Sequence, residues 1–370
     1  MKSSILDIVE RNIKGKQFNI VMGLGEELEQ NQITQDVCEQ FAQKHKNLVI
    51  LVGGFKSYPE NKKDPSNPFY DFKIEREIGN ITLNKGEIEF LIDDTLKITE
   101  ALKGEKVVKI AEYLEHVYQI LRNVYQKSEE TRKTGGIFRI LSVHPERVLL
   151  SLVFFDLIVH LTTSKPVEDF VKDKQFAKWI HQFSGIRGAI SAARFIRFLK
   201  VLLTSLRADV YDVLRISRIA LMETSDNLQF LLAPVGIDEA TNFEKKKYIL
   251  NNAAQILSDL EIEPHLSVMS GGRFGDVGRN KYVDETLKTA ELLTDYFSKE
   301  APIKHKLYND QILIEVAVKN GNFLLAPDGV TGNFIYRTLV YLGGGNAYGA
   351  LYSSVYFKHQ KVLIDTSRVA

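Results

Sequence analysis

The chain has 370 residues, of which 44% are hydrophobic and 26% charged, and this composition is typical of a globular protein with one or two domains. The formal net charge of +1 excludes a broad basic surface for nucleic acid. The single cysteine, Cys38, excludes an internal disulfide and a multi-cysteine metal site, and it favours a reducing, cytoplasmic location.

The first hundred residues alternate between strand and helix patterns. Residues 18–25 and 47–54 are apolar runs that end at glycines, and the helical pattern of residues 34–44 separates them. Continuous apolar strands that alternate with helices are typical of a parallel sheet with both faces covered. The sequence therefore predicts an α/β fold with a mostly parallel sheet.

From residue 104 to residue 184 helical periodicity dominates and glycine-rich strand turns are absent, which predicts a helical insertion outside the sheet. Its most apolar run, residues 148–161, is shorter than the roughly 20 residues that span a bilayer and contains Asp156. We expect a buried helix here and no integral membrane segment. A helix that faces a partner or a membrane surface is the alternative.

After residue 184 the sequence again alternates between strand and helix patterns. Residues 218–222 and 228–232 flank a turn and predict a hairpin, and residues 245–260 predict a helix. Short apolar strands are expected at 265–269, 322–325 and 361–365. The predicted organisation is an α/β domain built from residues 1–103 and 185–370, interrupted by the insertion at 104–184.

Two glycine-rich turns, residues 269–279 and residues 325–333, carry the functional prediction. Each follows a short strand and precedes a helix, where free backbone N–H groups suit an anionic ligand. The first turn contains two arginines, which favours a phosphate or carboxylate site. The residues expected to bind the anion or act in catalysis here are Ser270, Gly271, Gly272, Arg273, Asp276, Arg279, Asp328, Thr331, Gly332 and Asn333.

Structural interpretations remain open for several of these residues. Asp276 either orients an arginine or transfers a proton, and the alternative is an Arg–Asp pair that only holds the loop. Asp328 and Thr331 are alternatively turn and cap residues. Arg187 and Ser191, at the start of the helix predicted from residue 192, are further anion-binding candidates. A solvated arginine beside an ordinary helix cap is the alternative for that pair.

Glu315 is the candidate general base, because its neighbours in residues 312–317 are apolar and burial would favour proton acceptance. The alternative places Glu315 on the polar side of an amphipathic helix. No histidine pair has the spacing of zinc ligands, and the sequence identifies no cofactor.

Residues 326–333, then Gly343-Gly344-Gly345, then residues 365–368 resemble the C-terminal half of the phosphate acetyltransferases and phosphate acyltransferases. Residues 233–239 and 270–279, with Arg187-Gly188, are similar to motifs of the methanogenesis marker protein 4 family, whose members carry the label methyltransferase. The resemblance covers residues 185–368 strongly and residues 15–55 weakly.

The resemblance implies an isocitrate dehydrogenase-like α/β fold of two lobes, with a cleft that binds coenzyme A and an acyl phosphate. It places Glu315 where an acidic residue activates the thiol. It also places Ser270 and Arg273 where a ligand-binding stretch lies in that family. The function expected is that of a transferase acting on a small anionic or phosphorylated substrate in the interlobe cleft.

Acyl, phosphoryl and methyl transfer all stay open, and catalysis itself is not decided by the sequence. The alternative function is a non-catalytic ligand-binding or assembly protein that holds a partner through the helical insertion. A homodimer is a further open alternative.

Overall fold

The computed structural model describes residues 4–24, 28–53, 73–76, 81–82, 117–126, 136–141, 145–159, 165–188, 190, 192–205, 216–236, 240–300 and 302–366. Contacts within the chain divide it into two compact units. Unit 1 is built from residues 1–14, 215–360 and 369–370, and unit 2 from residues 15–214 and 361–368. Both units combine a sheet with helices, so the predicted α/β class is confirmed.

Unit 1 contains strands in the order β10-β9-β11-β8-β7-β12. β10, β9, β11 and β8 run parallel, whereas β7 is antiparallel to both β8 and β12. The predicted hairpin is formed by β7 and β8. The bounds are β7 (Arg218–Glu223), β8 (Gln229–Ala233), β9 (His265–Met269), β10 (Lys306–Gln311), β11 (Phe323–Leu325) and β12 (Asn346–Tyr352).

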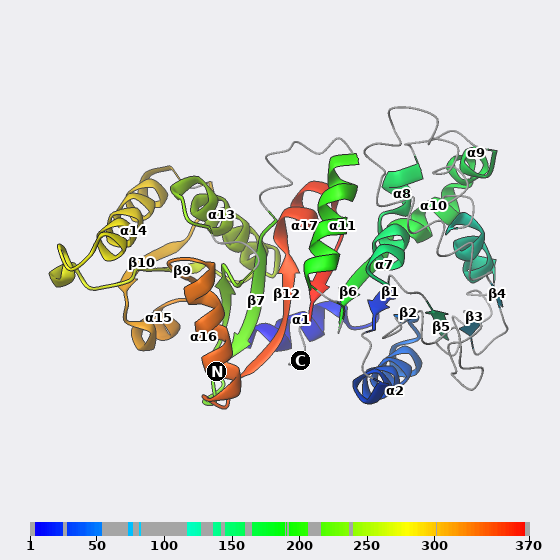
Figure 1. The fold of residues 1–370 in the computed structure, drawn as a ribbon, viewed down its shortest axis with the longest axis horizontal. Helices are drawn as coiled ribbons and strands as arrows, with labels where there is room; N and C mark the ends of the chain where they lie inside the picture. The colour runs from blue at the N-terminus through cyan, green and yellow to red at the C-terminus, as the bar shows by residue number, and fades with distance from the viewer. Residues whose placement is uncertain are drawn as a thin grey trace. The chain divides into compact units, whose positions relative to one another are not determined.

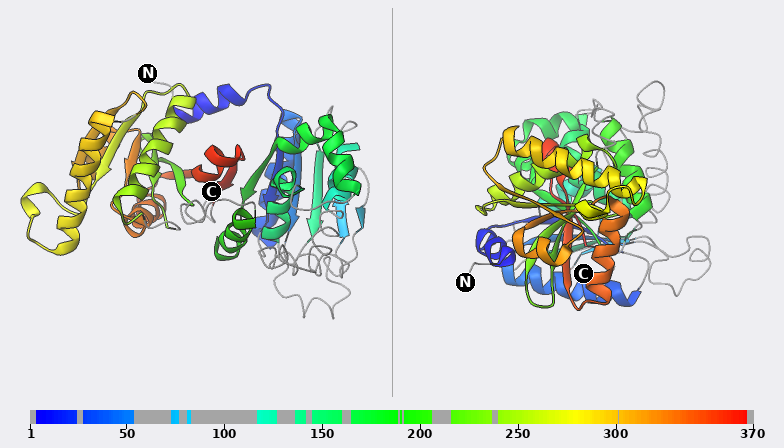
Figure 2. Two further views of the ribbon diagram at one scale, coloured as in Figure 1. Left: turned by 90° about the horizontal axis from the view of Figure 1, so that it is seen from above. Right: turned by 90° about the vertical axis from the view of Figure 1, so that its left-hand side faces the viewer.

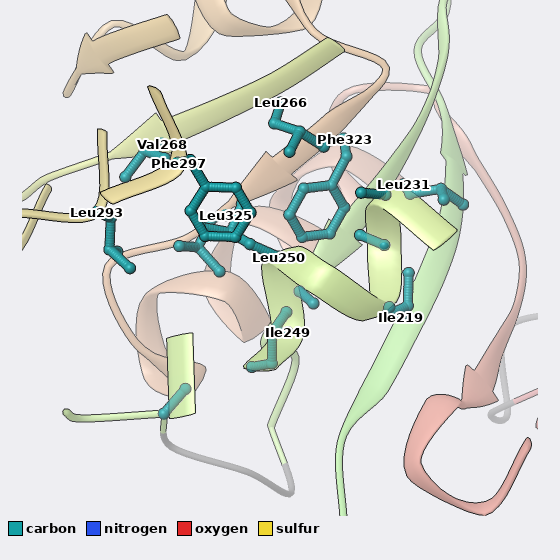
Figure 3. Packing of buried hydrophobic residues seen from close by; sticks show 14 of the residues in the cluster. Ile219, Leu231, Ile249, Leu250, Leu266, Val268, Leu293, Phe297, Phe323 and Leu325 are labelled. Carbon is teal, nitrogen blue, oxygen red and sulfur yellow. The ribbon is translucent and has the colours of Figure 1, made fainter. Parts of the chain in front are cut away.

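Helices cover both faces of these strands (Figures 1 and 2). Leu231 and Leu232 are neighbours on β8 and point to opposite faces, so each belongs to a different apolar cluster. In the first cluster Phe297 packs with Phe323 and Leu325 (Figure 3). The helices are α1 (Ile5–Ile13), α13 (Phe243–Asp259), α14 (Lys281–Glu300), α15 (Ile314–Asn320), α16 (Gly329–Tyr341) and α17 (Ser353–His359), with the short 3₁₀ helix η2 (Phe274–Asp276).

Unit 2 contains strands in the order β13-β6-β1-β2-β5-β3-β4, of which the first five run parallel. Their bounds are β1 (Asn19–Gly23), β2 (Leu48–Gly53), β3 (Lys73–Arg76), β4 (Ile81–Thr82), β5 (Gly136–Leu141), β6 (Phe183–Arg187) and β13 (Leu363–Asp365). The helices are α2 (Leu28–His45), α7 (Pro145–Val153), α8 (Phe155–Ile158), α9 (Lys165–Lys172), α10 (Lys174–His181) and α11 (Ala192–Ser205).

One part of the expected insertion belongs to the sheet. β5 lies inside residues 104–184 and pairs in parallel with β2 over its whole length, so the expectation that this segment lies entirely outside the sheet is wrong. β5 ends at Leu141 without a glycine turn, and its six residues were not distinguished from the helical pattern around them. The described residues from 145 to 159 and from 165 to 181 form helices α7 to α10, and a separate insertion domain stays a prediction.

The described part of the most apolar run, residues 148–159, lies in and around α7 and α8 and is largely buried within unit 2. This burial agrees with the expected buried helix and removes the exposed apolar face on which a partner-binding role was based. Among the residues that the structure describes, no helix has the length and apolar character needed to cross a bilayer.

Asp156, the one charged residue within that run, has a buried partner. One carboxylate oxygen lies 2.9 Å from the Nζ atom of Lys361, whose side chain is completely buried. The other oxygen lies 2.8 Å from Nδ1 of His181, and Lys361 also donates to the His181 carbonyl oxygen. Burial lowers the pKa of Lys361, and the Asp156 carboxylate opposes that shift.

Candidate functional site

The carboxyl ends of four parallel strands define one edge of unit 1. Because β8, β9 and β11 run in the same direction, the segments that follow them emerge at this edge together. α13, α14 and α16 follow these strands and have 17, 20 and 13 residues. The N-termini of these three helices, which are the positive ends of their dipoles, therefore lie at the same carboxyl edge of the strands as both glycine-rich turns.

The first turn is held by Asp276 within it and by polar side chains from α14 and β10. Asp276 accepts a hydrogen bond from the backbone N–H of Arg273 at 2.8 Å, and Asp284 accepts one from Gly278 at 2.8 Å. Gln311 and Thr286 accept further N–H groups of this loop, those of Phe274 and Gly271. The prediction of free N–H groups is therefore wrong for these four positions, because neighbouring polar side chains satisfy them.

The arginines of this turn remain accessible. Arg273 is exposed, and the side chain of Arg279 is 62% exposed and lies 4.0 Å from Asp276. Asp276 therefore holds the loop, as the structural alternative proposed, while both guanidinium groups face water. Ser270 is buried and donates to the Gly272 carbonyl oxygen at 2.9 Å.

The second turn begins α16. Asp328 is its N-cap and accepts from the Thr331 backbone N–H at 2.7 Å, which agrees with the cap interpretation. Burial alone would raise the pKa of Asp328, but hydrogen bonds from Thr331 and Tyr282 and the charge of Lys246 hold that pKa below its usual value. Asn333, one turn further along, is exposed.

Tyr282 joins the two turns. Its hydroxyl group donates to Asp328 and lies 3.3 Å from the Thr331 hydroxyl oxygen. Gly271 lies against its ring, where an added Cβ would be 2.9 Å from Cε1. Residues from β9, α14 and β11–α16 thus meet at one place. Sequence reasoning missed Tyr282 because an aromatic residue in the first turn of a helix has no distinguishing pattern.

Lys246 is a second residue that sequence reasoning missed. It lies in α13, is only 5% exposed, and has a pKa lowered by burial to about 8 although the Asp328 carboxylate opposes the shift. Its neighbours Lys245 and Lys247 make the stretch resemble an ordinary solvated helix face. Only the packing of α13 distinguishes the middle lysine from the other two.

Three of the residues predicted for the site are not found with the two glycine-rich turns, Tyr282 and Lys246. Arg187 lies in unit 2, is buried, and binds Asp365 and the Ile190 carbonyl oxygen, so its guanidinium is not the solvated group of the alternative interpretation. Ser191 lies outside the described residues. Glu315 is exposed in the first turn of α15, so the burial expected for a general base is absent.

Gly332 fixes how α16 approaches the loop that follows β8. A methyl group at this position would overlap the Pro234 carbonyl oxygen. We expect Gly332→Ala to lower the free energy of unfolding by about 1–3 kcal/mol, the usual cost of overpacking. Gly275→Ala is the control, because an added Cβ there meets nothing within 4 Å. Equal urea midpoints for both variants would show that α16 shifts freely.

No family model matches the chain. It is 47% identical over 155 residues to the "Putative methyltransferase mtx subunit X" of Methanosarcina barkeri, across 42% of this chain and 55% of the relative. Over 192 residues it is 35% identical to an uncharacterized methyltransferase of Methanocaldococcus jannaschii, across 50% of this chain and 72% of the relative. The chain spans only 55–61% of the length of the three Methanosarcina relatives that it matches.

Two solved structures are distantly similar. A branched-chain phosphotransacylase from Enterococcus faecalis has a TM-score of 0.47 and 14% identity, and the similarity covers 95% of this chain and 93% of that one. The EutD phosphotransacetylase from Staphylococcus aureus has a TM-score of 0.48 and 15% identity, with 99% and 93% covered. By its sequence similarity, the chain belongs to the family of proteins named as methyltransferases in Methanosarcina and Methanocaldococcus.

Proposed function

We propose that the chain is a group-transfer enzyme that binds a small anionic, phosphorylated substrate at the carboxyl edge of the unit 1 strands. The observation that carries the proposal is the meeting of the two glycine-rich turns through Tyr282 and Asp328. Two exposed guanidinium groups and three helix N-termini lie at the same edge. Positioning and charge neutralisation are the contributions that such a site makes to transfer chemistry.

The names of the relatives favour a methyl group, whereas the motif resemblance to phosphate acyltransferases favours an acyl group. One experiment separates the two. The purified chain is incubated with acetyl phosphate and coenzyme A, and in parallel with S-adenosylmethionine or a methylated corrinoid and a thiol acceptor. Mass spectrometry then detects the acetyl thioester of coenzyme A in the first arm or the methyl thioether of the acceptor in the second. Absence of turnover in every arm, with phosphate binding retained, would count against catalysis by this chain alone.

Arg273→Ala is expected to weaken the binding of inorganic phosphate and acetyl phosphate by about 1.5–3 kcal/mol, the scale of a charge-assisted hydrogen bond. Isothermal titration calorimetry measures the affinities. Lys281→Ala is the matched control, because it removes a nearby cation whose side chain is 89% exposed and lies 3.7 Å from Glu285. Unchanged affinity in a folded Arg273→Ala variant would remove this arginine from the site.

A further inference from the structure

Lys246 occupies a position that folding alone does not favour. The residue is only 5% exposed, and burial of a charged amine is costly unless the amine is paired. It lies four residues after the Asn242 N-cap of α13, near the positive end of the helix dipole, where a second positive charge is unfavourable. A methionine of similar length would avoid both costs.

The surroundings of Lys246 leave its amine available. Asp328 is the ionised group whose charge acts on it, but the two are not in ion-pair contact, and Tyr282 and Thr331 already donate to that carboxylate. The neighbouring Lys247 has a separate partner, because its Nζ atom lies 3.9 Å from the centre of the Tyr296 ring. Among the described parts of the chain, no group forms a hydrogen bond or an ion pair with the side-chain amine of Lys246, whose backbone N–H donates to the Asn242 carbonyl oxygen at 3.2 Å.

We propose that Lys246 is an anion-binding residue of the substrate site, and that a compact anion of the phosphate type supplies the partner that its ammonium group lacks. This inference rests on the proposed function, because it names a further residue of the same site. Asp328 and Tyr282 reach that site from α16 and α14, so the anion lies close to the hydrogen bond between these two side chains. In this proposal the anion is bound by a buried cation, Lys246, in addition to the exposed arginines of the first turn.

The proposal has a linked effect on protonation. An anion bound beside the amine favours its charged form and raises its pKa above the value of about 8 found without ligand. At pH 8 the free protein is partly deprotonated at Lys246, so binding takes up a fraction of one proton. Below about pH 7 the amine is already protonated and uptake disappears, whereas above pH 9 binding weakens.

Sulfate is the probe, because it does not titrate in this range. Its affinity is measured by calorimetry for the wild-type chain, for Lys246→Met and for Lys245→Met. We expect Lys246→Met to weaken binding roughly 10- to 100-fold and the matched variant Lys245→Met to change it little. Titrations at pH 8 in two buffers of different ionisation enthalpy then measure proton uptake, which Lys246→Met should abolish.

The outcomes separate this inference from the proposed function. If sulfate binds wild type and Lys246→Met equally, with the same proton uptake, Lys246 is not part of the site. If Arg273→Ala still weakens phosphate binding in that case, the proposed site stands without the lysine. If neither substitution affects anion binding, both proposals fail. Thermal unfolding of each variant confirms that the compared proteins are folded.

Discussion

Replacement of Asp156 by asparagine is expected to lower the free energy of unfolding of unit 2 by about 3–5 kcal/mol at pH 7. The substitution removes the charge that lies 2.9 Å from the amine of Lys361 and leaves that cation buried without a carboxylate. The only tryptophan of the chain, Trp179, lies in α10 of the same unit, so its fluorescence follows the unfolding of unit 2 in urea.

The pH dependence of this loss has a definite sign. Burial lowers the pKa of folded Lys361 below 10.5, so the unfolded chain binds the proton more tightly and stability rises with pH through that window. Without Asp156 the pKa of Lys361 falls further, and the deficit shrinks as pH rises from 7 towards 10. Glu168→Gln, an exposed change in α9, is the control. A constant deficit across this range would contradict the ion-pair explanation.

Lys246→Met is expected to stabilise unit 1 by about 3–4 kcal/mol at neutral pH. The pKa of the folded lysine is about 8 against 10.5 for the unfolded lysine, and each tenfold change in proton affinity corresponds to about 1.4 kcal/mol. The charged amine therefore destabilises the folded state fully below pH 8. The gain from methionine should decline as pH rises from 8 to 10.5 and the native amine loses its charge.

Circular dichroism in urea measures this gain, since Trp179 reports on unit 2 alone. Lys245→Met is the control for the loss of one charge from the same turn of α13. A destabilised Lys246→Met variant would show that the amine has a structural partner. A stabilised variant that no longer binds anions would be the pattern expected of a residue retained for function at a cost in stability.

The sequence predicted the strands of the sheets best where apolar runs end at glycine. β1 and β2 end at a glycine, and β9 and β11 are followed by one within four residues. Their runs are continuously apolar because helices cover both faces, as the pair Leu231 and Leu232 on β8 illustrates. β5 has the same burial but neither a glycine turn nor an isolated run, so its pairing with β2 became evident only in three dimensions.

The site was predictable as a pair of turns but not as a set of contacts. Asp276 and Asp328 have roles that cap and loop chemistry anticipate, since each accepts a nearby backbone N–H. The apolar neighbours of Glu315 suggest burial, yet Glu315 is exposed, and so are its neighbours Ile312 and Val316. Tyr282 and Lys246 depend on the packing of α13 and α14, which one-dimensional spacing does not encode.

The position of β13 in the chain has a consequence for synthesis. Residues 361–368 complete unit 2, yet the ribosome makes them only after residues 215–360, which belong to unit 1. Until residues 361–368 are made, Asp156 has no Lys361 to pair with and Arg187 has no Asp365. Two charges that are buried in folded unit 2 therefore lack their counter-ions in the nascent chain. Most of unit 2 is therefore made before residues 215–360, yet it reaches its native charge pairing only after those residues have been added.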